Sequence, residues 1–382
     1  MFRHQSYDYV FLGAGCASLS IVMRMLENGK FADKRILLID KAAKTENDRT
    51  WCYWEKEEGF FEPVVNKKWD TISFYSDDYC ADMDIAPYRY KMIKGIDFYG
   101  YCFNAISQYS SIETVYTTVD SFSKSGNKLS LVINGKSIVI DAGVVFNSII
   151  RPAEKDGKHI ELLQHFKGWV IETDHDVFNP AVATMMDFRV PQDKGTTFSY
   201  VLPVNKRMAL VEYTLFTKEL LQPHEYEKGL KNYISSFLGV TNFRLKEEEI
   251  GVIPMSSRRF NFEENGIYNI GTAGGQTKAS SGYTFQFIQK QSDQIVDALV
   301  AEKELRTISL SPGRFRFYDK VLLHILYYNK LPGDKIFSRL FKRNKPQQVL
   351  KFLDNETSLA EELKIISTLP MMPFLLAAMR QL

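Results

Sequence analysis

The sequence predicts an α/β protein with two domains and a helical C-terminal region. Three observations lead to this fold class: an apolar strand near the start that ends at two glycines, two stretches of short alternating strands, and a second glycine cluster late in the chain. At 382 residues, 45% of them hydrophobic, the chain is long enough to bury two cores, and its mixed charges are typical of a globular protein.

The first pattern is a strand, a glycine turn, a helix and a second strand. Tyr7–Leu12 is an apolar run, and Ile36–Asp40 is a second run that ends in an acid. Between them stands Gly13-Ala14-Gly15-Cys16-Ala17-Ser18. This order indicates a Rossmann-like dinucleotide-binding unit. Gly13 would make the tight turn, and Gly15 would let the backbone approach a pyrophosphate at the positive end of the helix.

Further cofactor contacts are expected around this unit. Asp40 ends the second strand, 27 residues after Gly13, where a carboxylate can accept hydrogen bonds from both ribose hydroxyls. Ser18 replaces the third glycine of the fingerprint, and its small side chain still permits close packing of helix and strand. Lys41 and Arg49 follow shortly and are added as candidate cofactor-binding residues. A glycine-rich turn in an ordinary α/β domain is the alternative interpretation.

Two β-rich stretches follow. In the first, residues 71–75 and 128–133 alternate as antiparallel strands, residues 97–109 have helical spacing, and residues 144–148 form a buried strand that returns to the first sheet. The second stretch runs from residue 165 to 215, and an amphipathic helix is expected at 217–238. The β-rich stretches therefore predict a separate sheet domain.

The late glycine cluster identifies the cofactor. A strand at 267–270 runs into Gly271-Thr272-Ala273-Gly274-Gly275, and a helix is expected at 283–302. Because this cluster lies about 260 residues after the first, the pattern favours FAD over NAD, since FAD is long enough to reach from one contact to the other. Gly271, Gly274 and Gly275 are therefore candidate FAD-binding residues in a flavoprotein fold of the glutathione-reductase type.

This alternation defines the expected domains. A Rossmann-like FAD-binding domain is interrupted by a β-sheet substrate domain, and a helical, basic and apolar region ends the chain. The FAD-binding domain is expected at 1–75, 110–165 and 265–305, the substrate domain at 76–109 and 166–264, and the C-terminal region at 306–382.

Charge is distributed unevenly along the chain. Residues 312–382 contain 12 Lys/Arg against 6 Asp/Glu, although the whole chain carries only +2. The basic segment from Lys330 to Lys351 precedes an apolar end, Leu369–Met379, a combination that favours attachment to an anionic membrane surface. A terminal helix packed on its own domain explains the tail equally well. The basic residues belong to no nucleic-acid-reading motif, so no nucleic-acid partner is predicted.

A cytoplasmic protein, peripherally associated with a membrane, is expected. The first strand starts within ten residues of Met1, which leaves no room for a signal peptide, and no run of 18 apolar residues could span a bilayer. Cysteines 16, 52, 80 and 102 lack CxxC spacing and nearby histidines. Neither disulfides nor a metal site is therefore predicted.

Four separated blocks carry a family resemblance. They are residues 8–41, 164–173, 198–216 and 269–285. Gln164-His165-Phe166-Lys167-Gly168-Trp169 is similar to a QHFxGW block, Phe198–Pro203 with Leu210–Thr214 to a pair of aromatic and acid-bearing strands, and Gly274–Tyr283 to a second flavin-binding segment. Together they resemble the FAD-containing lycopene cyclases of carotenoid-making bacteria and plants.

The chain departs from that family pattern at two places. Many members have two consecutive acids in the catalytic strand, whereas Glu212 is followed here by Tyr213, so only Glu212 can inherit the acid's role. Related flavoproteins place Gly-Asp where this chain has Gly271-Thr272, which weakens a redox role.

The resemblance implies cyclisation of the linear ends of lycopene or γ-carotene to β-ionone rings in carotenoid biosynthesis, an isomerisation without net redox. Glu212 would donate the initiating proton, which requires burial to keep its carboxyl protonated. Reduced FAD would stabilise the carbocation electrostatically, with NAD(P)H as an external reductant. Trp51, Trp169 and Tyr200 are candidates for contact with the substrate.

Other functions remain open at this point. A flavin-dependent monooxygenase or prenyl-chain reductase would use the same fold for redox chemistry, and a non-enzymatic prenyl-lipid-binding chaperone would keep the fold without FAD. His165 is expected to be a hydrogen-bonded core residue. Whether the rings are β or ε, and whether one or both ends are cyclised, also stays open.

Overall fold

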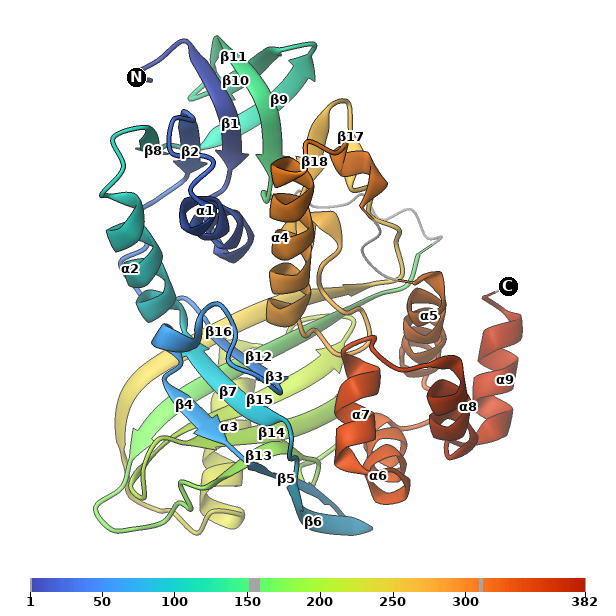
Figure 1. Cartoon of the computed structure of the whole chain (residues 1–382). Helices are drawn as coiled ribbons and strands as arrows, with labels where there is room; N and C mark the ends of the chain where they lie inside the picture. The colour runs from blue at the N-terminus through green and yellow to red at the C-terminus, as the bar shows by residue number, and fades with distance from the viewer. Residues whose placement is uncertain (1, 151–158, 309–311, 382) are drawn as a thin grey trace.

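The N-terminal apolar run and the acid-terminated run form parallel strands joined by a helix. The computed structural model describes residues 2–150, 159–308 and 312–381, and its β1 (Ser6–Leu12), α1 (Cys16–Asn28) and β2 (Ile36–Asp40) build the predicted unit (Figure 1). β1 pairs in parallel with β2 on one side and with β11 (Lys136–Asn147) on the other. α1 starts directly after Gly15, so the positive end of its dipole faces the glycine turn.

The rest of the first sheet comes from three parts of the chain. β8 (Ile112–Tyr116) pairs in parallel with β2, and β18 (Ile267–Asn269) pairs in parallel with β11. β10 (Lys128–Ile133) pairs antiparallel with the first half of β11 and with β9 (Val119–Ser125). The short β17 (Glu263–Glu264) pairs with β18, and α4 (Phe285–Val300) packs against α1 (Figure 1).

The second sheet lies below the first in Figure 1 and is mainly antiparallel. Its strands, in spatial order, are β16 (Arg244–Ser256), β12 (Glu161–Glu172), β15 (Met208–Thr217), β14 (Thr196–Pro203), β13 (Val182–Asp187), β5 (Thr71–Ser76) and β6 (Tyr79–Asp84). The edge strand β16 is not among the strands that the sequence predicted. The expected helix at 217–238 is α3 (Pro223–Ser236); it starts later because β15 extends to Thr217 and Gln222 forms a capping box with Glu225.

A small third sheet, in the order β3-β7-β4, lies beside the second one. It contains β3 (Thr50–Glu55), β7 (Arg89–Lys94) and β4 (Lys67–Trp69), and β7 leads into α2 (Gly95–Ile106), the helix expected at 97–109. α2 packs against α1, whereas β5 pairs with β13 of the second sheet. Segments predicted for one domain thus also contact the other, and the proposed domain boundaries remain predictions.

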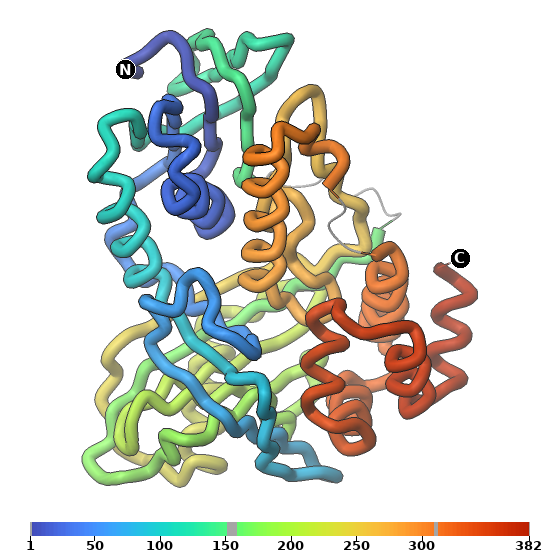
Figure 2. The backbone as a smooth tube through the Cα atoms, viewed as in Figure 1, coloured from blue at the N-terminus to red at the C-terminus, as the bar shows by residue number. Residues whose placement is uncertain are grey.

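The C-terminal region is helical, as predicted, and covers one face of the second sheet (Figures 1 and 2). It comprises α5 (Gly313–Tyr327), α6 (Gly333–Arg343), α7 (Pro346–Leu353), α8 (Leu359–Ser367) and α9 (Met371–Met379). Aromatic contacts seal the interface: Phe341 stacks on Phe74 with ring centroids 4.8 Å apart, and Phe337 stacks on Phe188 at 5.7 Å. None of the helices within the described ranges combines the length and hydropathy that a bilayer crossing requires.

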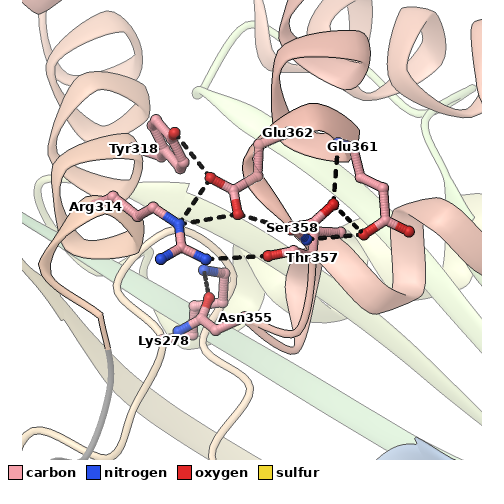
Figure 3. Close-up of polar contacts among 8 residues, drawn as sticks. All are labelled: Lys278, Arg314, Tyr318, Asn355, Thr357, Ser358, Glu361 and Glu362. Atoms are coloured by element: carbon pink, nitrogen blue, oxygen red, sulfur yellow. Dashed lines mark hydrogen bonds and ion pairs between the residues drawn. The ribbon is translucent and has the colours of Figure 1, made fainter.

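Polar contacts fix these helices to the late glycine segment (Figure 3). The Arg314 guanidinium on α5 donates through Nε to both carboxylate oxygens of Glu362 at 3.0 Å, and the Tyr318 hydroxyl donates to the same carboxylate at 2.9 Å. The Lys278 ammonium donates to Asn355 Oδ1 at 2.7 Å. Glu362 is fully buried, so this charge-assisted network holds α5, α8 and the α7–α8 connection in one arrangement.

Candidate active site

The glycine turn after β1 has the geometry that a phosphate cradle requires. Gly13 has φ +92°, and a Cβ there would collide with Ser148 Oγ, so the turn needs glycine. The Ser18 hydroxyl donates to the Gly13 carbonyl at 2.5 Å and holds the turn to the helix. Among the described residues, nothing lies within 4 Å of a Cβ built on Gly15, and no side chain caps this end of α1. The first turn of α1 therefore leaves its N–H groups without a side-chain acceptor from the described part of the chain.

Asp40 lies at this turn, as its place in the sequence predicted. It is buried, and its Oδ2 accepts a hydrogen bond from the Ala14 backbone N–H at 2.7 Å. Its Oδ1 lies 3.3 Å from the Lys44 ammonium. Lys41 is exposed at the end of the strand, and Arg49 forms an ion pair with Asp48 at 3.3 Å. Asp40 thus orders the glycine turn even without a ligand.

The late glycine cluster packs directly against the first turn of α1. Gly271 opens the short 3-10 helix η2 (Gly271–Gly274) with φ +59°, and a Cβ on it would lie 2.8 Å from the Ala17 Cβ of α1. A Cβ on Gly274 would collide with the Asn269 carbonyl, and Gly275 has φ +75°. Two glycine segments far apart in the sequence are therefore brought into contact, which is the arrangement that a long dinucleotide needs.

A cavity of about 340 Å³ lies between the second sheet and the 281–285 segment, and Thr272 of η2 borders it. Glu212 on β15, Tyr200 on β14, Trp51 on β3 and Arg49 border it. Other lining residues are Cys52, Tyr90, Gln164, Phe166, Leu202, Leu210, Ile250, Ile253, Ser281, Tyr283 and Phe285. A larger cavity, about 650 Å³ between the second sheet and the α5–α6 connection, borders none of the predicted site residues.

Trp169 is not brought to this cavity. It lies on the opposite face of β12, buried in the cluster under α3, where its indole N–H donates to Glu248 at 2.9 Å. The reason is the alternation of side chains along a strand: Gly168 is on the cavity face, so its neighbour Trp169 must point away. Trp169 is therefore removed from the substrate-contacting candidates.

A row of residues in register crosses four strands at the cavity. Tyr200 lies opposite Glu212, Glu212 lies opposite Gly168, and Gly168 lies opposite Glu249 on the edge strand β16. A Cβ on Gly168 would lie 3.0 Å from the Glu249 Cγ and 3.0 Å from the Leu210 Cδ1. The missing side chain at Gly168 leaves room for carboxyl groups from two strands that are not neighbours.

Burial and like charge make Glu212 a proton carrier. Burial, and then the neighbouring Glu249 carboxylate, raise the pKa of Glu212 to about 8, while a hydrogen bond from Thr214 opposes the shift. The Thr214 hydroxyl donates to Glu212 Oε1 at 2.5 Å. Burial also raises the pKa of Glu249, whose Oε2 accepts a hydrogen bond from the Thr50 hydroxyl at 2.7 Å. The pKa values of both carboxyl groups are raised, and the two groups titrate as a coupled pair.

Buried polar atoms at the cavity lack partners within the described ranges. They are the Gln164 Oε1 and the Ser281 Oγ, whereas the Tyr283 hydroxyl lies within hydrogen-bonding reach of the Tyr90 and Tyr200 hydroxyls. Burial raises the pKa values of Tyr90, Tyr200 and Tyr283, so all three phenols stay neutral. Orphaned polar groups facing a cavity mark a place where a bound molecule completes the hydrogen bonding.

The sequence analysis missed several residues of this site. Glu249 was missed because β16 was not recognised, since its first half, Arg244 to Glu249, is charged at nearly every position. The only available signal was the apolar run Ile250–Pro254 that follows three acids. Tyr283 ends the segment Gly274–Tyr283, which resembles a second flavin-binding segment, but the sequence assigned no role to it. His165 is the buried, hydrogen-bonded residue predicted, with contacts of 2.6 Å to both Thr217 and Tyr226.

The fold is that of FAD-dependent flavoproteins. Similar solved structures include a geranylgeranyl bacteriochlorophyll reductase-like protein from Thermoplasma acidophilum (12% identity, TM-score 0.63, 95% of this chain and 96% of that chain). The flavin-dependent brominase Bmp2 (12%, 0.62, 94% and 97%) and a flavoprotein/dehydrogenase from Cytophaga hutchinsonii (11%, 0.62, 92% and 93%) are also similar. The predicted α/β class with a Rossmann-type domain is confirmed.

The family follows from the sequence comparison. The family model described as lycopene cyclase protein matches residues 8–379, nearly the whole chain, so the chain belongs to this family. Among curated proteins, none matches the chain significantly.

Proposed function

We propose that this protein is a flavin-dependent lycopene cyclase that closes β-ionone rings at the linear ends of lycopene and γ-carotene without net redox change. The observation that carries the proposal is the Glu212 carboxyl, half-buried at the cavity wall beside Leu202 and Leu210, with a pKa raised to about 8. Such a group keeps its proton at neutral pH and can deliver it to a hydrocarbon double bond. Membership of the lycopene cyclase family supports the choice of substrate.

The residues around the glycine turn fit FAD. The open space at Gly15 and the start of α1, which no described side chain caps, suit a pyrophosphate, and η2 packs close enough for a second contact. The orphaned Gln164 Oε1 and Ser281 Oγ can hydrogen-bond a polar ring edge. When bound in reduced form, with NAD(P)H as the external reductant, FAD would supply negative charge beside the cavity.

The proposed reaction adds one proton to the substrate and later removes one proton from the ring. Transfer of the Glu212 proton to the terminal double bond leaves a carbocation, and the neighbouring double bond closes on it to form the ring. Loss of a ring proton then yields an isomer of the substrate, so no electrons are gained or lost. Thr214 holds the Glu212 carboxyl at the cavity wall through its 2.5 Å hydrogen bond. The faces of Trp51 and Tyr200 at the cavity can stabilise the cation by roughly 0.5–2 kcal/mol each.

Redox use of the same fold is the main rival. A prenyl-chain reductase or a flavin-dependent monooxygenase would consume NAD(P)H in proportion to product, whereas a cyclase would not. A prenyl-lipid-binding chaperone would purify without flavin and would make no product. Because reduction of a double bond adds a proton as well as a hydride, Glu212 would suit a reductase too, and the consumption of NAD(P)H is the measurement that separates the two functions.

Expression in a lycopene-accumulating host tests the proposal. Chromatography of the pigments should give cyclic carotenoids with the wild-type chain and unchanged lycopene with Glu212→Gln. Glu248→Gln is the matched control, because Glu248 lies on β16 of the same sheet but contacts Trp169 on the other face. Unchanged lycopene with a folded, flavin-containing wild-type protein would rule the function out.

We also propose that the protein works on a membrane surface, as a cytoplasmic protein attached peripherally. α8 and α9 carry large apolar side chains that are 50–71% exposed: Leu359, Leu363, Met371, Met372, Leu375, Leu376 and Met379. This set is here called the apolar terminal face. Phe374 and Ala377 of α9 pack inward against the core. The two sequence interpretations of the tail are therefore compatible, and the nearby Lys364 and Arg380 suit anionic lipid.

A further inference from the structure

We propose that Glu249 is the second carboxyl group of this site, a positioning residue that shares a single proton with Glu212 and acts through it. The inference deepens the proposed cyclase function and rests on that function for the molecule that receives the proton. The sharing of the proton itself is a property of the folded protein and can be measured without substrate.

The geometry of the sheet brings the two carboxyl groups together. Glu212 and Glu249 both lie opposite Gly168, one from each neighbouring strand of β12, in the same row. Two residues that lie opposite the same residue, one on each neighbouring strand, are normally kept apart by the side chain of that middle residue. Glycine removes that separation, and the 3.0 Å distance from a Cβ built on Gly168 to the Glu249 Cγ shows that Glu249 leans over it.

A hydrogen bond from Thr50 holds the Glu249 side chain in place. Its Oε2 accepts the Thr50 hydroxyl at 2.7 Å, and the side chain is 9% exposed although it belongs to an edge strand. It does not border the cavity, whereas Glu212 does. Glu249 can therefore affect the cavity through Glu212 and through Thr50, which also borders the cavity.

The titratable groups that face the pair come from four strands and from the 281–285 segment. Glu247 and the Lys94 ammonium act on Glu249 with opposite signs, and these two side chains form an ion pair with each other at 2.9 Å. Cys52, Tyr200 and Tyr283 face Glu212 but stay neutral, because burial raises their pKa values. The two carboxyl groups lie within hydrogen-bonding reach of each other, and Glu212 is the one that borders the cavity, so we assign the proton to Glu212.

The shared proton balances the proposed reaction. At rest the pair holds one proton, on Glu212, and one negative charge, on Glu249. Donation to the substrate leaves two carboxylates beside the new carbocation, and this excess negative charge favours return of a proton. The proton that the ring loses restores the resting pair. Substrate and product have the same atoms, and no solvent proton is consumed.

Infrared titration of the protein, with ¹³C-labelled glutamate, measures the pair directly. The band of a protonated carboxyl group should persist above neutral pH in the wild type and vanish in Glu212→Gln. In Glu249→Gln the same band should disappear at lower pH, with the proton affinity of Glu212 reduced about tenfold or more, because the neighbouring negative charge is gone. Glu248→Gln, on the other face of β16, should titrate like the wild type.

The cyclisation rate should follow the same titration. In Glu249→Gln the pH above which kcat falls should move down with the band, while KM and flavin content stay unchanged; a merely structural role would not move this profile. Glu249→Asp should restore the wild-type pH in part. Gly168→Ala is a second route to the same shift if Glu249→Gln does not fold, because its Cβ would separate the carboxyl groups.

The two proposals fail in different ways. If Glu249→Gln or Gly168→Ala folds and leaves the Glu212 band and its pH unchanged, the shared proton is refuted even if rings are formed. An ordinary carboxyl pKa in the wild type refutes it as well. If the band behaves as expected but the wild type makes no cyclic pigment, the pair stands and the cyclase function falls.

Discussion

Glu212 and Glu249 approach each other across Gly168, the residue opposite both of them on the strand between. A methyl group at position 168 would lie 3.0 Å from the Glu249 Cγ and from the Leu210 Cδ1, closer than ordinary van der Waals contact. Gly168→Ala should therefore reduce cyclisation roughly tenfold or more, by pushing the carboxyl groups apart, and should cost about 1–3 kcal/mol of stability by overpacking. Pigment yield and chemical unfolding measure the two effects. Unchanged ring formation would mean that the close approach has no catalytic value.

The second prediction concerns the proton donor. Glu212→Gln keeps the size and hydrogen bonding of the side chain but has no acidic proton, so ring formation should fall by about two to four orders of magnitude while flavin stays bound. Glu212→Asp should fall less, because it retains the acid but withdraws it by one methylene. Tyr213 cannot replace it, since it lies on the opposite face in the cluster under α3. Near-wild-type product from Glu212→Gln, with flavin bound and reduced, would require another donor.

The third prediction is a pH dependence with a defined sign. The Glu212 pKa is raised from 4.5 to about 8, so the active, protonated form is present below pH 8 and is lost as the pH rises through that value. The same shift lowers stability: between pH 4.5 and 8 the folded chain keeps a proton that the unfolded chain releases, so the free energy of unfolding falls as pH rises. Glu212→Gln lacks this proton. As the pH rises from 4.5 to 8, the free energy of unfolding of Glu212→Gln should therefore increase relative to that of the wild type, by the order of a few kcal/mol. Parallel unfolding curves at pH 5 and 8 measure the difference, and equal pH profiles would contradict it.

The fourth prediction tests the flavin cradle. Gly15→Val would place a branched side chain in the open space at the start of α1, and the purified protein should lose its flavin absorbance. Gly100→Val is the matched control, because Gly100 also has open space at its Cβ but lies in α2, away from the turn. Flavin retained in Gly15→Val would show that the pyrophosphate lies elsewhere.

The fifth prediction concerns the apolar terminal face. Met372→Glu with Leu376→Glu should abolish sedimentation with anionic vesicles and leave the fold intact, since both side chains are more than half exposed. Val139→Glu, half exposed on β11, should bind like the wild type. High salt should weaken the wild-type interaction, by about 1 kcal/mol for each basic residue that is screened near the surface. Deleting residues 369–382 is a less clean test, because Phe374 and Ala377 pack against the core. Equal sedimentation of the double variant and the wild type would favour a tail that serves only as a packed helix.

Much of the nucleotide-binding region could be predicted because its signals are local. An apolar run, two glycines and an acid within 34 residues specify the strand, turn, helix and second strand, and the structure has them at Ser6–Asp40. The positive φ of Gly13 and Gly271 is likewise a local requirement of the backbone. Short-range physics of this kind is visible in a single sequence.

The sequence by itself determined the α/β class, the two glycine segments and Glu212 on a strand whose neighbours alternate. It could not decide which face of β12 meets the cavity, and so it placed Trp169 there, because period-two alternation fixes that neighbouring residues point to opposite faces but not which face is which. Nor could it find Glu249, since β16 becomes a strand by pairing with β12 rather than by its own composition. Only the tertiary structure decided the strand register. That register places Glu212, Gly168 and Glu249 in one row, and the resulting burial and like charge keep Glu212 protonated.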